Sequence, residues 1–224
     1  MAAVPAAVRD RIRDADRSRE AILGAAERLF AEHGYDGTSL NDIAEASGLS
    51  RATPSYFFGS KDQLYRDVLD RVFATRQHAM AAAFGPVLEW CEGDAGLRAL
   101  RRALTRAAEG YMTFLSAHPS FVRLLMREEL DGGARLRSRS TVSTAMQDAF
   151  AAVRKAGRAR GLRRFDVDEA VLVFIALTFA PLSYRSTLMR AVRRDLDRDA
   201  GRRRQIELAV DQLMHLLAGD RGQR

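Results

Sequence analysis

Cysteine and long apolar runs are scarce in this sequence of 224 residues, and each scarcity excludes a class of protein. The single cysteine, Cys91, cannot form a disulfide within the chain, which favours a reducing compartment. The longest apolar run, Val171–Ala180, is too short for a membrane span, which needs about 20 residues. Residues 1–17 are rich in Ala, Arg and Asp and lack the apolar core of a signal peptide. The sequence therefore predicts a cytoplasmic protein that does not associate with membranes.

Groups that carry catalysis or bind metals are also few. The four histidines show no spacing typical of metal ligands, and Cys91 has no base beside it in the sequence. The chain contains neither a G-x-S-x-G motif, nor a P-loop, nor a dinucleotide-binding glycine motif. We therefore predict that the chain is not an enzyme and binds no metal or cofactor. Catalytic turnover by a variant that lacks residues 39–58, the segment interpreted below, would favour the alternative that the chain is an enzyme.

Positive charge is abundant but unevenly distributed. The chain has 36 Arg and Lys against 29 Asp and Glu, a net charge of +7, and 34 of the basic residues are arginines. Residues 1–76 hold 11 basic and 12 acidic residues, so the excess lies in the remainder of the chain. Net charge therefore does not by itself locate a DNA-binding region, and a motif must carry that argument.

Apolar residues recur at helical spacing almost throughout, and alternating β-branched runs are rare, so we predict an all-α fold. A flexible basic arm is expected over residues 1–17. A first helix is expected from about Ser18 to Glu32, with Ile22 and Phe30 on its apolar stripe. Gly34 then suits the left-handed position that ends a helix.

Residues 39–58 predict a helix-turn-helix. Ser39, followed three residues later by Asp42, resembles a capping box at the start of a helix. Ala44 supplies a small side chain where two crossing helices touch, and Gly48 supplies a turn residue that tolerates positive φ. Ser50 is expected to cap a third helix over 51–58, which is left free to enter a major groove.

Three motifs in the same stretch resemble the DNA-binding domain of the TetR family over 18–65. They are A-x-x-L-F-A-E-x-G-Y at the end of the first helix, T-S-x-x-D-I-A at the start of the second, and Y-F-x-x-S-K-x-x-L-Y after the third. The resemblance implies an N-terminal three-helix DNA-binding domain over 18–65 and a C-terminal helical bundle over 66–224 that binds ligand and dimerises. It also implies a bacterial transcriptional regulator, most simply a repressor that a small-molecule effector releases from operator DNA.

The resemblance also implies which residues contact double-stranded DNA. By position they are Ser39 and Asn41 in the second helix, Arg51, Ala52, Thr53, Ser55, Tyr56 and Phe57 in the third, and Lys61 after it. Arg51 has the geometry to pair with guanine through two hydrogen bonds, whereas Ser39 and Asn41 would hold phosphate. Two positions depart from the family pattern. Pro54 replaces a usual Leu or Ile, and Ser55 replaces a usual Tyr, so the operator sequence need not follow that of known relatives.

Breaker residues divide the remainder into helices over 61–84, 94–117, 119–130, 134–160, 167–190 and 201–218. The last two are apolar on more than one face, and the resemblance implies that they form the homodimer interface. A dimer would read the two halves of a pseudo-palindromic operator. Large apolar side chains in this half are candidates for the effector pocket. They are Trp90, Tyr111, Phe114, Met126, Met146, Phe150 and Phe174.

Two alternatives remain besides the enzyme. An architectural DNA-binding protein without an effector would need a basic DNA-binding face and no large bundle, whereas residues 1–76 are close to neutral. A transcriptional activator would carry the same motifs as a repressor.

Overall fold

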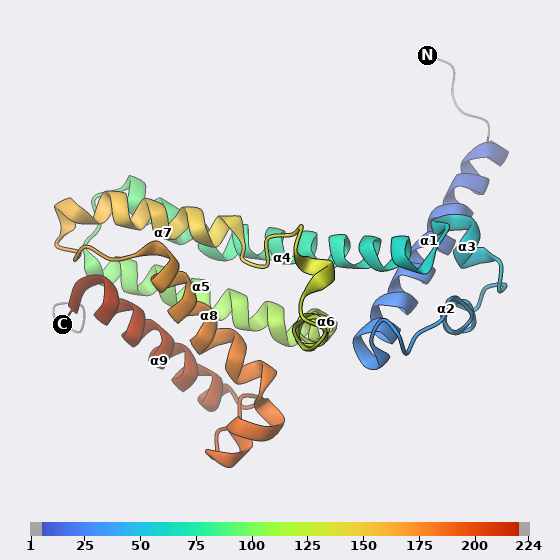
Figure 1. The fold of residues 1–224 in the computed structure, drawn as a ribbon. Helices are drawn as coiled ribbons and strands as arrows, with labels where there is room; N and C mark the ends of the chain where they lie inside the picture. Colours follow the sequence, from blue (N-terminus) through green and yellow to red (C-terminus); the bar gives the residue numbers. More distant parts are fainter. Residues whose placement is uncertain (1–5, 220–224) are drawn as a thin grey trace. The chain divides into compact units, whose positions relative to one another are not determined.

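The computed structural model describes residues 6–219, with side chains from residue 13 onward. These residues form α-helices joined by turns and by a few 3-10 or π-helical segments, with no strand among them (Figure 1). The α-helices are α1 (Ala6–His33), α2 (Leu40–Ser47), α3 (Thr53–Phe58), α4 (Lys61–Glu92), α5 (Leu97–Ala117), α6 (Pro119–Leu130), α7 (Thr144–Gly157), α8 (Val167–Ser183) and α9 (Asp199–Ala218). Two short 3-10 helices are η1 (Ala134–Leu136) and η2 (Arg158–Arg160), and a π-helical segment is η3 (Arg185–Met189).

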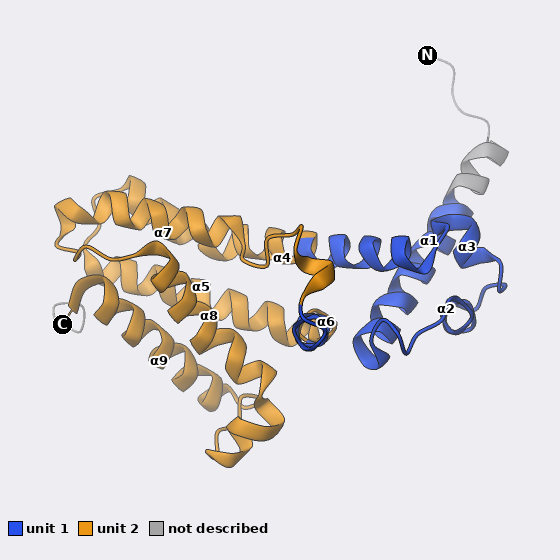
Figure 2. Ribbon diagram, in the orientation of Figure 1, with its two compact units in different colours: residues 1–73, 123–132 blue, residues 74–122, 133–224 orange. Residues whose placement is uncertain are grey.

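The chain divides into two compact units (Figure 2). Unit 1 contains the residues up to Phe73 together with Arg123–Gly132, and unit 2 contains the rest. Two helices, α4 and α6, are therefore shared between the units. The sequence placed the boundary after residue 65, but the structure extends unit 1 along α4 to Phe73 and adds most of α6.

Unit 1 is built around α1, whose apolar stripe is fully buried. Ile22 and Phe30 have no exposed surface, and α2 and α3 both pack against this helix. From α4, the Tyr65 ring meets the Phe30 ring edge to face with centroids 4.8 Å apart. This packing positions α2 and α3 against α1.

Unit 2 is a helical bundle in which α8 contacts α5, α7 and α9. Four buried aromatic rings lie between its helices: Phe84 of α4, Tyr111 of α5, Phe150 of α7 and Phe174 of α8. Their centroids are 5.2 to 6.2 Å apart. Burial raises the pKa of Tyr111 to about 12, so this phenol is neutral at physiological pH.

The first helix begins at Ala6, twelve residues before the predicted start at Ser18. Residues 6–17 are therefore helical where a flexible arm was expected, and residues 1–5 lie outside the described part. Ala and Arg have high helix propensity, and no Gly or Pro interrupts the chain between Pro5 and Gly24. Asp14 and Arg17 also pair one turn apart at 3.4 Å.

Helix α4 continues to Glu92 through Gly85 and Pro86, which the sequence predicted as a break. A proline inside a helix costs about 3 kcal/mol. Val87 and Trp90 follow it and are buried, and burying such side chains contributes about 1.5–3 kcal/mol each. The far end is held by Arg160, which donates to the carbonyls of Trp90 and Cys91. Tertiary packing thus overrides the local break.

The predicted helix over 134–160 is shorter in the structure, where α7 spans Thr144–Gly157. Gly132 and Gly133 both have positive φ, which stops the preceding helix and turns the chain into η1. The segment before α7 is held by Arg76, whose guanidinium donates to the carbonyls of Ser140 and Thr141. Local sequence carries no sign of this long-range anchor.

The remaining helices lie close to their predicted ranges. Helix α5 begins at Leu97 instead of 94, and α9 begins at Asp199 instead of 201. The predicted helix over 167–190 ends at Ser183 and is followed by η3. Within residues 6–219, no helix is both long and apolar enough to cross a membrane.

Candidate nucleic-acid interface

The start of α2 is fixed by the predicted capping box. The Ser39 hydroxyl donates to Asp42 Oδ2 at 2.7 Å and accepts from the Asp42 amide at 3.2 Å, and the Ser39 amide donates to the same carboxylate at 2.8 Å. These hydrogen bonds from Ser39 lower the pKa of the Asp42 carboxyl. The box therefore places a carboxylate at the helix end where phosphate contacts were predicted. Asn41 is exposed beside it.

The turn between α2 and α3 has the geometry that the sequence predicts. Gly48 has φ 71°, and its amide donates to the carbonyls of Ala44 and Glu45. The Leu49 amide also donates to the Ala44 carbonyl, at 3.0 Å. This left-handed cap ends α2 and redirects the chain.

Helix α3 begins at Thr53, two residues later than predicted. Pro54 has no amide hydrogen and cannot continue a helical bond back to Ser50, so the first turn is closed by the Thr53 amide on the Ser50 carbonyl. The Ser50 hydroxyl lies 2.7 Å from that of Thr53, while the residue at the cap position is Ala52. The predicted cap at Ser50 is thus replaced by a turn.

Helix α3 has a buried face and an exposed face, with Thr53 and Phe57 half-buried between them. Pro54 and Phe58 are buried, and the Arg19 guanidinium lies 4.4 Å from the centre of the Phe58 ring. Ser55 and Tyr56 are exposed, and Tyr56 keeps 83% of its surface accessible. Pro54 is therefore buried at the position where the resemblance implies Leu or Ile.

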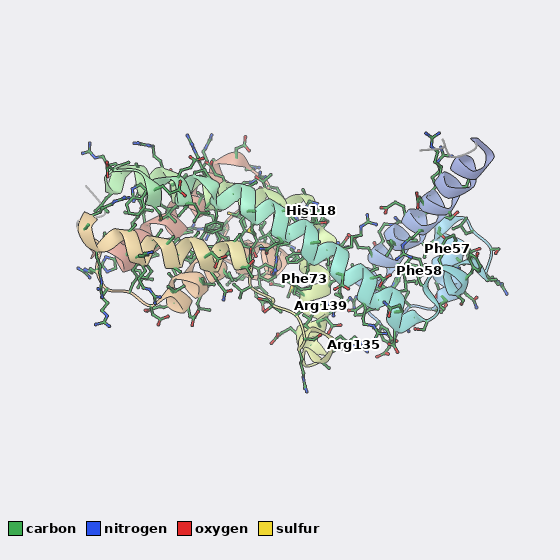
Figure 3. The ribbon with its side chains drawn as sticks, turned by 90° about the horizontal axis from the view of Figure 1, so that it is seen from above. Phe57, Phe58, Phe73, His118, Arg135 and Arg139 are labelled. Carbon is green, nitrogen blue, oxygen red and sulfur yellow. The ribbon has the colours of Figure 1, made fainter. Side chains whose placement is uncertain are left out.

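The other predicted contact residues of α3 lie beside this exposed face. Arg51 and Ala52 are exposed in the turn that leads into α3, and Thr53 is half-buried. Phe57 is also half-buried and meets the Tyr56 ring edge to face at 5.3 Å, next to buried Phe58 (Figure 3).

Lys61, at the start of α4, is half-buried with its Nζ 4.2 Å from the centre of the Tyr35 ring. The Tyr35 hydroxyl donates to the Asp62 carboxylate, and the Ser60 hydroxyl accepts from the Gln63 amide at 3.1 Å. The aromatic ring thus positions the ammonium group at the N-terminus of α4.

Contacts from α6 to the base of this unit were missed in the sequence. Arg127 donates to the carbonyls of Ala31, at 2.9 Å, and Glu32, at the C-terminal end of α1. On the next residue, Glu128 accepts from the Tyr65 hydroxyl at 2.5 Å. These residues are separated by more than 60 positions, so no local pattern pointed to them.

The candidate effector residues do not form one cluster. Tyr111, Phe150 and Phe174 belong to the buried ring cluster of unit 2, and Met146 is buried as well. Phe114 instead stacks on His118, which is labelled in Figure 3, with centroids 4.5 Å apart. The two remaining candidates lie elsewhere: Trp90 is under the Arg160 guanidinium, and Met126 belongs to unit 1.

A capped helix, a left-handed glycine turn and a short second helix with an exposed face together define a helix-turn-helix protein. Comparison with known proteins agrees. The family model "Bacterial regulatory proteins, tetR family" matches residues 22–68, and "Tetracyclin repressor-like, C-terminal domain" matches residues 101–213.

Two similar curated proteins are transcriptional repressors. NicS of Pseudomonas putida is 29% identical over 83% of this chain and 85% of its own length. AcnR of Corynebacterium efficiens is 31% identical over 69% of this chain and 73% of its own. Among solved structures, SCO4942 of Streptomyces coelicolor has a TM-score of 0.63 at 19% identity, covering 89% of this chain and 98% of that one. The chain belongs to the TetR family of bacterial regulatory proteins, and its function is transcription regulation through DNA binding.

Proposed function

We propose that this protein is a repressor that binds a pseudo-palindromic operator as a homodimer and is released by a small-molecule effector. The exposed face of α3 carries the proposal. Tyr56 keeps 83% of its surface accessible although aromatic side chains are usually buried, while Pro54 and Phe58 anchor the opposite face. A short helix held in this way presents its outer side chains to a major groove.

Within this interface we assign base reading to Arg51, in the turn that leads into α3, and to Thr53, the first residue of α3, because neither is buried. Arginine donates two parallel hydrogen bonds to guanine, and the threonine methyl suits a thymine methyl. Tyr56, Phe57, Ala52 and Ser55 would contact the sugar-phosphate backbone and neighbouring base edges.

Phosphate contacts are assigned to Asn41, Ser39 and Lys61. Asn41 is exposed in the first turn of α2, where backbone amides and the helix dipole favour anions. The Ser39 hydroxyl already donates to Asp42. Ser39 would therefore contribute to phosphate binding through its position at the N-terminus of α2 and not through this hydroxyl hydrogen. Lys61 supplies positive charge at the start of α4.

We assign dimerisation to the outer faces of the last two long helices, within 167–190 and 201–218. Leu172 of α8 keeps 66% of its surface exposed in the single chain, and Ile175 and Phe179 are only half-buried. These residues recur at helical spacing on a helix whose other side packs on its own bundle. An isologous pairing would bury them.

Effector release is supported by the course of α4 and α6, each of which belongs partly to unit 1 and partly to unit 2. In unit 1, α6 holds the end of α1 through Arg127 and contacts Tyr65 of α4 through Glu128. A ligand that favours one arrangement of unit 2 would thereby bias the DNA-binding unit. The family is regulatory, and we assign no catalytic role to the chain.

The test begins with in vitro selection of genomic DNA fragments on the purified protein. Binding is then measured to the recovered operator and to its single-base variants. Arg51→Ala should lose about 1–3 kcal/mol on the operator and discriminate less at one base pair of each half-site. Lys61→Ala serves as the matched comparison, because loss of a phosphate contact weakens all sequences alike and flattens the salt dependence. Equal binding of the unmodified protein to all DNA would contradict the proposal.

A further inference from the structure

The densest run of positive charge in the chain lies far from the helix-turn-helix in sequence. Residues 154–164 contain six cations and no carboxylate. The run begins in the last turn of α7, passes through η2 and ends just before α8. Gly161, with φ 82°, and the Leu162 amide, which donates to the Gly157 carbonyl at 3.0 Å, turn the chain back on itself. The two ends of the run therefore face one cleft.

This cleft has a volume of about 840 Å³ and lies wholly within unit 2. Five of its lining residues are cations: Arg154, Lys155, Arg158, Arg163 and Arg164. Phe165 and Leu216 add apolar surface, and Asp166 and Glu169 are its carboxylates. Its volume falls within the range of about 300–1,000 Å³ that is usual for small-molecule sites.

The sixth cation of the run, Arg160, has a structural role, in contrast to the five that line the cleft. Its guanidinium donates to three carbonyls at the end of α4 and stacks on Trp90 at 4.6 Å. Arg160 does not line the cleft. The side chains of the five that do line it have no hydrogen-bond or ion-pair partner among the described residues.

The carboxylates of the cleft do not balance this charge. Asp166 Oδ1 accepts from the amides of Asp168 and Glu169, at 2.8 and 3.1 Å, and so caps α8. Glu169 is the other carboxylate that lines the cleft, against five cations. All five cations are exposed, so solvent and salt weaken their mutual repulsion without removing it, and a bound anion would relieve what remains.

Helix stabilisation explains only part of the cluster. Arg154 and Lys155 lie in the last turn of α7, where cations offset the helix dipole. Arg163 and Arg164 lie just before the N-terminus of α8, where cations are unfavourable. Arg163 is also held in place, because its amide donates to the Leu217 carbonyl at 2.7 Å and its guanidinium packs against Gly219.

We propose that this cleft binds a small polyanion, a molecule that carries at least two phosphate or carboxylate groups. Its charged groups would bridge the α7 side, with Arg154 and Arg158, and the loop side, with Arg163 and Arg164. Half-buried Leu216, with the edge of buried Phe165, offers a small apolar wall to the body of the molecule. A concave site with such a wall fits a small molecule better than a nucleic-acid backbone, which binds along open surfaces. The proposal is independent of the operator and of the effector.

The test measures binding to the full-length protein without DNA, by calorimetry at low and physiological salt. Tripolyphosphate is the probe for phosphate groups and propane-1,2,3-tricarboxylate is the probe for carboxylate groups. The variant Arg158→Gln/Arg164→Gln removes one cation from each side of the cleft. Arg102→Gln/Arg106→Gln is the matched control, because it removes the same charge from the exposed face of α5. Circular dichroism confirms that both variants are folded.

We expect saturable binding of at least one probe with one site per chain. Its dissociation constant should rise at least tenfold in the cleft variant and change less than twofold in the control. Failure of both probes to saturate, or equal losses in the two variants, would overturn the proposal. So would a cleft variant whose operator affinity and salt dependence both fall, since the cations would then contact DNA.

Discussion

Two residues at the start of α2, Ser39 and Asp42, make the stability of the folded protein depend on pH. Their hydrogen bonds lower the pKa of the Asp42 carboxyl below the value of 3.8 that it has in an unfolded chain. The folded protein therefore favours the ionised form. The stabilisation is complete above pH 3.8 and is lost as the pH falls through the lower pKa of the folded state.

We expect Asp42→Asn to be less stable than the unmodified protein at neutral pH. The difference should shrink as the solution is acidified below the pKa of the unfolded carboxyl. Urea unfolding at a series of pH values measures it directly. Glu45→Gln is the control, because Glu45 is exposed on the same helix and its side chain takes no part in the capping box. A constant difference between Asp42→Asn and the unmodified protein at all pH values would show that the carboxylate charge is irrelevant to the cap.

Single residues were predictable where their chemistry is local. Ser39 with Asp42, and Gly48 alone, specify a cap and a turn within a few positions of themselves, and both have the predicted geometry. The start of α3 was placed wrongly because the missing amide of Pro54 outweighs the capping preference of Ser50. The DNA contacts assigned to Arg51 and Lys61 remain predictions.

At the scale of the element, the turn of the helix-turn-helix depends on the left-handed conformation of Gly48. A Cβ at this position would meet no atom within 4 Å, so the cost of Gly48→Ala is conformational alone. We expect a loss of about 1–2 kcal/mol in the free energy of unfolding, together with weaker operator binding. Gly24→Ala is the matched control. Gly24 lies inside α1, and its Cβ would meet only the Arg28 side chain at 3.8 Å, so this change should stabilise by about 0.5–1 kcal/mol. Equal effects of the two substitutions on the free energy of unfolding would refute the claim that the positive φ of Gly48 disfavours alanine there.

The sequence predicted the type of each secondary-structure element better than it predicted where each element begins and ends. All the long helices were expected, because apolar spacing survives in each of them. Their ends depend on partners far away in sequence. Pro86 is accommodated because Val87 and Trp90 are buried, and the start of α7 is set partly by Arg76, more than 60 residues earlier. Local pattern cannot reveal such contacts.

At the scale of the whole molecule, the assignment of α6 explains why the predicted domain boundary differs from the structure. Residues 123–132 lie far along the chain but belong to unit 1, where Arg127 satisfies carbonyls that α1 leaves without helical partners. The predicted effector residues were chosen for size and apolar character, which core residues share. Burial of Phe150 and Phe174 in the ring cluster is accordingly what core packing requires.

The proposed dimer is a property of the whole molecule, and the proposed operator reading depends on it, since one short helix reads too few base pairs. Leu172→Glu places a charge on the outer face of α8, where the leucine is 66% exposed in the single chain. Because that face is assigned to the partner, we expect the mass in solution to fall from twice to once the chain mass of 24.9 kDa, with the helical content unchanged. Light scattering coupled to size-exclusion chromatography measures this. Leu130→Glu is the control, since Leu130 is 86% exposed on α6 and lies outside the proposed interface. If Leu172→Glu remained a dimer while still folded, the interface would have to lie on another face, and the spacing of the two reading helices would have to be set by other elements.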